Sequence, residues 1–174
     1  GRVDIIIAEL LSTGLFYEPF VEAIHNLRTY LAPGGAILPS RVISRVSLMN
    51  AATEMYGLRF KHDVRYRKIR EDTLLSTSAV YDSLDLFGEP RSAVDATVKL
   101  RIIRSGEANA LRITSRAWLS GDIWLGRSRF LFCPLVLFLK TARSVLDLQR
   151  YRIALRYQYG EEALDASIGI NQVL

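Results

Sequence analysis

The chain contains very little cysteine and histidine, which excludes several kinds of site. Its 174 residues include one cysteine, Cys133, and two histidines, His25 and His62. A single thiol cannot form an internal disulfide, and one thiol with two imidazoles cannot make a four-ligand structural zinc site. We therefore expect no bound metal, a buried and unreactive Cys133, and a reducing, cytoplasmic setting.

Long hydrophobic runs are missing as well. The longest apolar stretch, residues 130–139, is interrupted by Pro134. A membrane-spanning helix needs about 20 apolar residues, so we predict a strand here and no membrane partner. The sequence also shows no signal peptide. Because Gly1-Arg2 leads directly into an apolar strand, and parallel strands are normally covered on both faces, we expect the chain to begin inside a larger domain.

The residues that are present can form a folded core. Hydrophobic residues make up 49% of the sequence and charged residues 24%, with a formal net charge of +5. These proportions are ordinary for a globular protein. The length allows one domain, or two small units that share a core.

The first 38 residues have an α/β pattern. Val3–Ile7 is predicted to be a buried parallel strand and residues 8–17 a loop. Apolar residues then recur at helical spacing from Phe20 to about Leu31, and Ala32-Pro33-Gly34-Gly35 is expected to end that helix. This order is typical of a doubly wound sheet.

From residue 39 onward the pattern is that of strands. Alternating or apolar segments occur at 42–49, 94–104, 107–119, 129–140, 151–159 and 164–170. They predict an antiparallel barrel or sandwich, interrupted by an insertion at 51–92 that includes a short helix at 51–60. The expected fold class is therefore α+β, mainly β. Residues 1–38 are the remnant of a doubly wound sheet, and residues 39–174 form a β-barrel with an inserted arm.

Two acids nine residues apart are the clearest candidate site. Glu9 directly follows the predicted strand, and Glu18 precedes the predicted helix. Two carboxylates in a partly dry pocket favour a cation, and a guanidinium matches them because its planar donors form paired hydrogen bonds. The alternative is that both are ordinary loop acids, with Glu18 stabilising the start of the helix.

Two further features have competing interpretations. The insertion carries six basic residues against one nearby acid, Asp63; the basic residues are Arg59, Lys61, Arg65, Arg67, Lys68 and Arg70. This cluster is either a solvated arm or a docking surface for an acidic peptide, RNA or another subunit. Trp118 and Trp124 are expected to fill the barrel or an interface, with a peptide-binding rim as the alternative.

The segment from Asp4 to Glu18 resembles the double-glutamate loop of the protein arginine methyltransferases. The resemblance rests on Asp4-Ile5-Ile6-Ile7-Ala8-Glu9 and Gly14-Leu15-Phe16-Tyr17-Glu18, and it continues through Leu31–Arg41. Met55-Tyr56-Gly57-Leu58 resembles the start of that family's dimerisation arm. Beyond residue 58 the likeness is one of architecture.

The resemblance implies a function for particular residues. Glu9 and Glu18 would be catalytic, gripping the guanidinium of an arginine in a protein or peptide while S-adenosylmethionine donates a methyl group. Tyr17 and Phe20 would contact the substrate, although Tyr17 is also expected to pack at the base of the loop. Ala8 and Glu9 would lie against the cofactor. The resemblance further implies a homodimer formed through residues 51–92.

The sequence departs from the family pattern in two places. The glycine-rich loop and the acid that hold the cofactor do not occur in this chain, so this fragment alone is expected to be inactive. The family's Thr-His-Trp motif is also absent, and the comparable region, residues 124–129, contains no histidine. Two alternatives therefore stay open: a non-catalytic barrel for oligomerisation or docking, and a methyltransferase acting on RNA or a small molecule. Nucleic acid is the less favoured partner.

Overall fold

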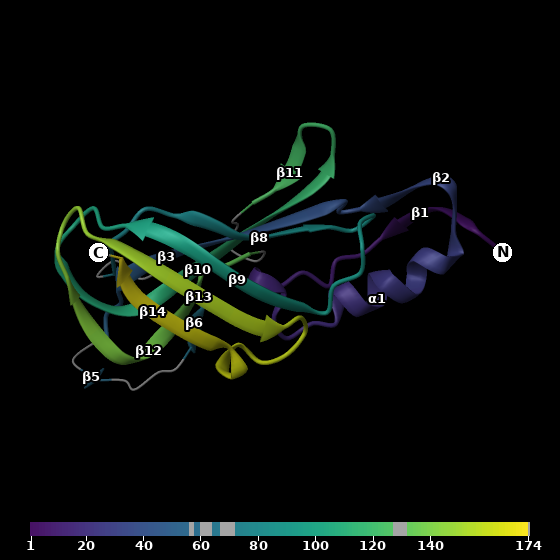
Figure 1. Cartoon of the computed structure of the whole chain (residues 1–174). Helices are drawn as coiled ribbons and strands as arrows, with labels where there is room; N and C mark the ends of the chain where they lie inside the picture. Colours follow the sequence, from purple (N-terminus) through teal and green to yellow (C-terminus); the bar gives the residue numbers. More distant parts are fainter. Residues whose placement is uncertain (56–57, 60–63, 67–71, 127–131, 174) are drawn as a thin grey trace.

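A computed structural model describes residues 1–55, 58–59, 64–66, 72–126 and 132–173. A short α/β unit at the amino-terminal end is followed by a larger structure of antiparallel strands (Figure 1). No helix among these described residues is long and apolar enough to cross a membrane.

The α/β unit contains two parallel strands, β1 (Val3–Ile7) and β2 (Leu31–Leu38). The connection between them carries the short turns η1 (Thr13–Leu15) and η2 (Arg28–Tyr30) and the helix α1 (Phe20–Leu27). The predicted parallel strand is thus confirmed. Within this chain, however, Ile6 is its one buried residue, whereas the other side chains are exposed, up to 76% for Ile7.

Two predictions for this unit were wrong. The α-helix ends at Leu27 rather than near Leu31, and Pro33-Gly34-Gly35 lies inside β2 instead of forming a terminating turn. The glycines make this possible because the strand bulges there. Gly34 has a φ of +79°, and a Cβ on Gly35 would lie 2.8 Å from the Asp4 carbonyl oxygen.

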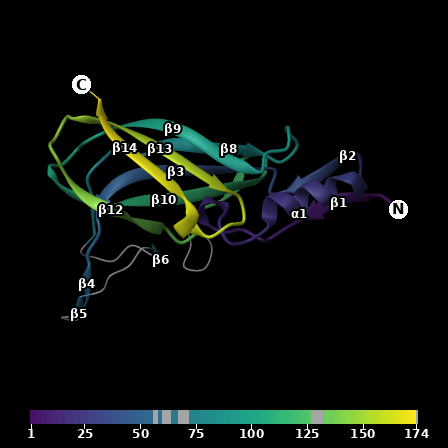
Figure 2. The same cartoon turned by 60° about the horizontal axis from the view of Figure 1, so that its bottom comes forward.

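Two antiparallel sheets curl around one core to form the β-structure (Figures 1 and 2). The seven-stranded sheet has the order β6 (Val64–Tyr66), β12 (Leu135–Val145), β10 (Gly106–Ser120), β3 (Arg41–Asn50) and β7 (Thr73–Leu74), with β11 (Ile123–Leu125) beside β10 and β8 (Ala79–Asp85) beside β3. The three-stranded sheet consists of β14 (Ser167–Val173), β13 (Arg150–Gln158) and β9 (Ala93–Arg101), and η3 (Ala163–Asp165) precedes β14. The expected class, α+β and mainly β, is confirmed.

The insertion differs from its prediction. β8 pairs with β3 inside the larger sheet, so residues 79–85 belong to the β-structure rather than to an arm. The helix predicted at 51–60 is absent from the described residues there, where β4 (Glu54–Met55) and β5 (Leu58–Arg59) form a small hairpin away from the sheets (Figure 2). The segments 56–57, 60–63 and 67–71 lie outside the described residues, and with them the basic residues Lys61, Arg67, Lys68 and Arg70.

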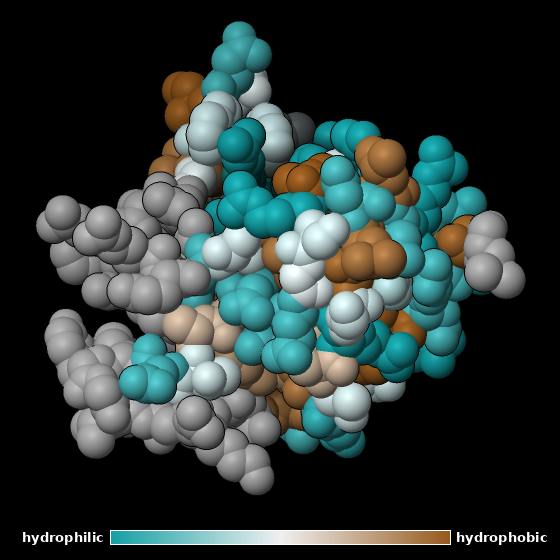
Figure 3. Space-filling model, turned by 90° about the vertical axis from the view of Figure 1, so that its left-hand side faces the viewer, coloured by the Kyte–Doolittle hydropathy of each residue, from teal (hydrophilic) through white to brown (hydrophobic). Residues whose placement is uncertain are grey.

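The core has two main parts. One fills the space between the two sheets and is built from alternate residues of β3, β10, β12 and β13. The other lies where α1 and β1 pack on the near end of the large sheet, around Phe20, Ile24 and Val42. At the end of the molecule opposite α1, hydrophobic side chains are scattered among hydrophilic ones (Figure 3). Exposed apolar residues of the turns there include Ile103, Leu146 and Leu148.

Candidate functional site

The loop between β1 and α1 carries both predicted catalytic acids and has an unusual backbone. Gly14, Leu15 and Tyr17 have φ values of +75°, +60° and +67°. Glycine is required at the first of these positions, because a Cβ on Gly14 would lie 2.6 Å from the Phe16 ring. Non-glycine residues adopt positive φ at a cost, so the surrounding structure must hold this loop in place.

Two adjacent apolar side chains anchor the middle of the loop in different parts of the core. Phe16 is fully buried in the cluster between the two sheets, where its ring centroid lies 4.2 Å from that of Tyr157. Leu15 is buried in the cluster beneath α1. The loop therefore connects the two parts of the core, and residues far apart in the sequence fix its position.

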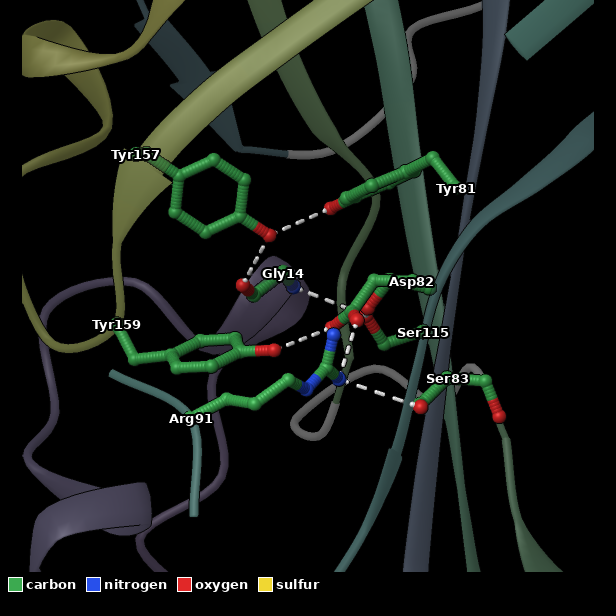
Figure 4. Close-up of polar contacts among 9 residues, drawn as sticks. Gly14, Tyr81, Asp82, Ser83, Arg91, Ser115, Tyr157 and Tyr159 are labelled. Carbon is green, nitrogen blue, oxygen red and sulfur yellow. Dashed lines mark hydrogen bonds and ion pairs between the residues drawn. The ribbon is translucent and has the colours of Figure 1, made fainter. Parts of the chain in front are cut away.

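Hydrogen bonds from side chains of two strands, β10 and β13, hold the backbone of Gly14 (Figure 4). Its N–H donates to Ser115 Oγ at 2.9 Å, and its carbonyl accepts from the Tyr157 hydroxyl at 2.8 Å. The Ser115 hydroxyl lies 2.8 Å from that of Ser44, and the Tyr157 hydroxyl 3.0 Å from that of Tyr81. Satisfying buried polar atoms in this way lets an irregular loop enter the core.

A second group of polar contacts lies beside this network, where the Tyr159 ring is 6.2 Å from that of Tyr157. The carboxylate of Asp82 accepts hydrogen bonds from Arg91 Nη2 at 2.8 Å and from the Tyr159 hydroxyl at 2.9 Å (Figure 4). Burial raises the pKa values of Tyr81, Tyr157 and Tyr159 well above the ordinary tyrosine range. The pKa of Arg91 is also raised: burial lowers it, but the hydrogen bond to Asp82 and the electrostatic effects of Tyr159, Asp82 and Tyr157 together raise it more. At neutral pH the three phenols are therefore neutral hydrogen-bond donors.

Both acids lie at the ends of the loop and are not part of this network. Glu9 is exposed and Glu18 is half-buried. Among the described residues, neither carboxylate makes a hydrogen bond or ion pair. The arrangement thus combines a fixed loop with two carboxylates that can accept a ligand.

The turn after β13 covers the Glu18 end of the loop. Gly160 N–H donates to the Leu15 carbonyl at 2.9 Å, and Tyr17 N–H donates to the Glu161 carbonyl at 3.0 Å. Gly160, with a φ of +81°, packs against the backbone of Glu18. The turn therefore brings a further exposed acid, Glu161, close to Tyr17 and Glu18.

The other predicted site residues occupy different environments. Tyr17 is half-buried, and its ring lies 6.3 Å from that of Phe16, which fits the expected packing at the base of the loop. Phe20 is fully buried in the cluster where α1 and β1 pack on the large sheet, so its ring is not exposed in this structure. Ala8 is half-buried, and its N–H donates to the Leu38 carbonyl at 3.0 Å.

The network that fixes the loop could not be found from the sequence. Ser115, Tyr157, Asp82 and Arg91 are single residues on separate strands or loops, and no motif connects them to the double-glutamate segment. The sequence signal that could have indicated this network is the presence of polar residues, such as Ser44 and Ser115, at inward-facing positions of apolar strands.

The described residues do not by themselves form a site for S-adenosylmethionine. Ala8 and Glu9 follow β1 at the edge of a two-stranded sheet whose apolar residues are largely exposed. The described pockets lie elsewhere, at β12 and β14, on the outer face of β3 and β10, and beside α1. Within the described residues, no three His, Cys, Asp or Glu side chains are grouped to hold a metal.

The fold of this chain is similar to that of a protein arginine methyltransferase. The chain matches a chain of the Trypanosoma brucei PRMT1 enzyme–prozyme heterotetrameric complex with AdoHcy at a TM-score of 0.69. The match covers 99% of this chain and 70% of that one, at 12% sequence identity. The predicted resemblance is thus confirmed as a likeness of fold.

Sequence comparison finds a similar protein whose function is uncharacterized. The chain is 25% identical over 172 residues to the uncharacterized protein MJ1452 of Methanocaldococcus jannaschii. That match covers 97% of this chain but 62% of the relative, so the chain spans less than two thirds of the relative's length. No family model matches the sequence.

Proposed function

We propose that this chain is the acceptor-binding part of an S-adenosylmethionine-dependent N-methyltransferase, and that its acceptor is a guanidinium of an arginine in a protein. The observation that carries the proposal is the loop itself. Its middle is fixed by buried contacts to both parts of the core, whereas Glu9 and Glu18 at its ends have no partner among the described residues.

The chemistry follows from the two carboxylates. A free guanidinium has a pKa above ~12 and is a weak nucleophile, because its lone pairs are delocalised into the cation. Glu9 and Glu18 would accept its N–H hydrogen bonds, orient one nitrogen and draw positive charge away from that nitrogen. A loop that is already fixed loses little further entropy on binding, which favours positioning of the acceptor.

The methyl donor would be held by residues outside this chain. The described residues supply Ala8 and Glu9 at the end of β1, with no glycine-rich turn and no enclosing pocket around them. The T. brucei complex that this fold resembles contains AdoHcy, which makes S-adenosylmethionine the reasonable donor to test.

We also propose self-association through residues 51–92, of which 56–57, 60–63 and 67–71 lie outside the described residues. The complex with the similar fold is a heterotetramer. Sedimentation analysis at high protein concentration tests this part. A single monomeric species would contradict it without affecting the methyl-transfer proposal.

Calorimetric titration with S-adenosylmethionine tests the main proposal. The titration is done with this chain and with the protein at its full natural length, followed by a methylation assay on arginine peptides. We expect binding and methyl transfer with the natural length alone, and loss of at least about 100-fold in turnover for Glu9→Gln and Glu18→Gln with unchanged cofactor binding. If a folded full-length protein binds no S-adenosylmethionine, the barrel is instead a docking module. Wild-type turnover in both variants would contradict the assigned roles.

A further inference from the structure

The outer face of the large sheet has a groove that is separate from the double-glutamate loop. It has a volume of about 690 Å³ and lies over β3 and β10, with β8 and β11 beside it. Three of its residues are arginines and two are tryptophans, namely Arg45, Arg112, Arg116, Trp118 and Trp124. No acidic side chain is among the described residues that line it.

The register of the strands sets the distances between the three arginine positions. Arg45 pairs with Thr114, so Arg112 and Arg116 are its diagonal neighbours on β10, at roughly 7–8 Å. Arg112 and Arg116 are four residues apart along one strand, which corresponds to about 13 Å. The three arginines therefore start from positions spread along the groove, a spacing that suits a chain of anionic groups.

Two of these arginines have no carboxylate partner in the described part of the chain. Arg45 donates to the hydroxyl and carbonyl of Ser78, which are neutral acceptors. The guanidinium of Arg116 lies 4.4 Å from the ring centroid of Trp124. Their charge is therefore available to an anionic ligand, and the low density of acids would leave the groove electropositive.

Fixed aromatic side chains distinguish this groove from a simple charged surface. Trp118 and Trp124 are direct cross-strand partners of β10 and β11, which places both on one side of the sheet. Trp124 contacts the Arg116 guanidinium and lies close to Gly126, where a Cβ would lie 2.2 Å from its ring, yet the residue remains 46% exposed. Of the expected positions for the two tryptophans, the inside of the barrel is thus excluded because both lie on its outer face, and a place in an interface or a binding rim stays a prediction.

We propose that this groove binds a single-stranded nucleic acid. Arginines spaced along a groove can follow a phosphate backbone, and exposed, fixed indole rings can stack on unpaired bases. An acidic peptide would satisfy the arginines but would leave the two tryptophans without a stacking partner. The inference does not depend on methyl transfer by the double-glutamate loop.

Another basic face of the molecule offers a matched comparison. On the three-stranded sheet, Arg150 pairs with Arg101 and Arg152 pairs with Lys99. These side chains are exposed, and the aligned positions of β9 and β13 include no tryptophan. Removing one charge from this face tests whether binding follows overall charge or the groove.

The test measures fluorescence anisotropy of a labelled oligo(U) of about 12 nucleotides, within the usual site size for one such domain. The protein is the 174-residue chain, titrated at several salt concentrations. We expect the logarithm of the binding constant to fall with the logarithm of salt with a slope of about −2, for three phosphate contacts. Arg45→Gln and Arg116→Gln should each weaken binding roughly tenfold and reduce that slope by about 0.7. Trp124→Leu should weaken binding at least about fivefold with little change in slope.

Arg152→Gln should bind like the unaltered chain, and circular dichroism should show all four variants folded. The proposal is overturned by absence of binding at low salt, or by equal losses for Arg152→Gln and Arg116→Gln. Equal affinity for poly-glutamate and for oligo(U), with no effect of Trp124→Leu, would also overturn it and identify an acidic peptide instead.

Discussion

The middle of the double-glutamate loop and its two ends are adjacent in sequence but differ in every physical respect. Gly14, Leu15 and Phe16 are buried and touch both parts of the core, the Gly14 backbone is hydrogen-bonded, and Leu15 has a positive φ. Glu9 and Glu18, a few residues away, are exposed or half-buried and lack partners among the described residues. If the proposed function holds, stability and ligand contact depend on separate residues of this one loop.

The largest stability effect is expected from removing the central anchor. Phe16→Ala would leave a cavity between the two sheets and lower the free energy of unfolding by about 3–5 kcal/mol. Chemical denaturation measures this loss. Phe87→Ala is the control, since Phe87 is 46% exposed, and its cost should stay below about 1 kcal/mol. Similar costs for the two variants would contradict the anchoring role.

Alkaline pH should loosen the same central region. The pKa values of Tyr81 and Tyr157 are raised by burial, so above pH ~10 the unfolded state releases protons that the folded state keeps. Stability is therefore complete below pH ~10 and falls above it by about 1.4 kcal/mol per pH unit for each buried phenol. Denaturation midpoints between pH 9 and 11 measure the slope.

Tyr157→Phe should make this alkaline slope shallower by about one proton. Tyr30→Phe, at a tyrosine that is 58% exposed, should leave it unchanged. If the two variants have the same slope, the buried hydroxyl network does not titrate as described.

A smaller effect is expected at Gly14. Both Gly14→Ala and Gly34→Ala place a side chain at positive φ, but open space surrounds Gly34 whereas Gly14 faces the Phe16 ring. Gly14→Ala should therefore cost about 1–3 kcal/mol more than Gly34→Ala in thermal denaturation. Equal costs would mean that the loop relaxes and that the close contact does not hold it.

The smallest effect on stability is expected at the ends of the loop. Glu9→Gln and Glu18→Gln should change the free energy of unfolding by less than about 0.5 kcal/mol, because neither carboxylate has a partner among the described residues. The same denaturation measurement checks this. A loss above 1 kcal/mol would assign these acids a structural role and weaken the proposal that they bind substrate.

Several features of the fold could be predicted because they depend on local sequence. Apolar runs and alternation predicted the strands β1, β3, β9, β10 and β13 closely. The boundaries of β2 and α1 were missed because a bulge at Gly34-Gly35 lets a strand continue through residues that normally end one. β8 was assigned to an insertion because its mixed apolar spacing shows no clear alternation, and its pairing with β3 is a tertiary contact.

For the candidate site, the two acids and their position between a strand and a helix could be identified from the sequence, since spacing and residue type are local properties. The sequence also indicates that the backbone at position 14 can adopt a positive φ, because the residue is glycine. Which residues hold that loop depends on tertiary structure, because Ser115 and Tyr157 reach it only when strands β10 and β13 close around the core. In the same way, the strand register alone decided that three arginines and two tryptophans share one groove.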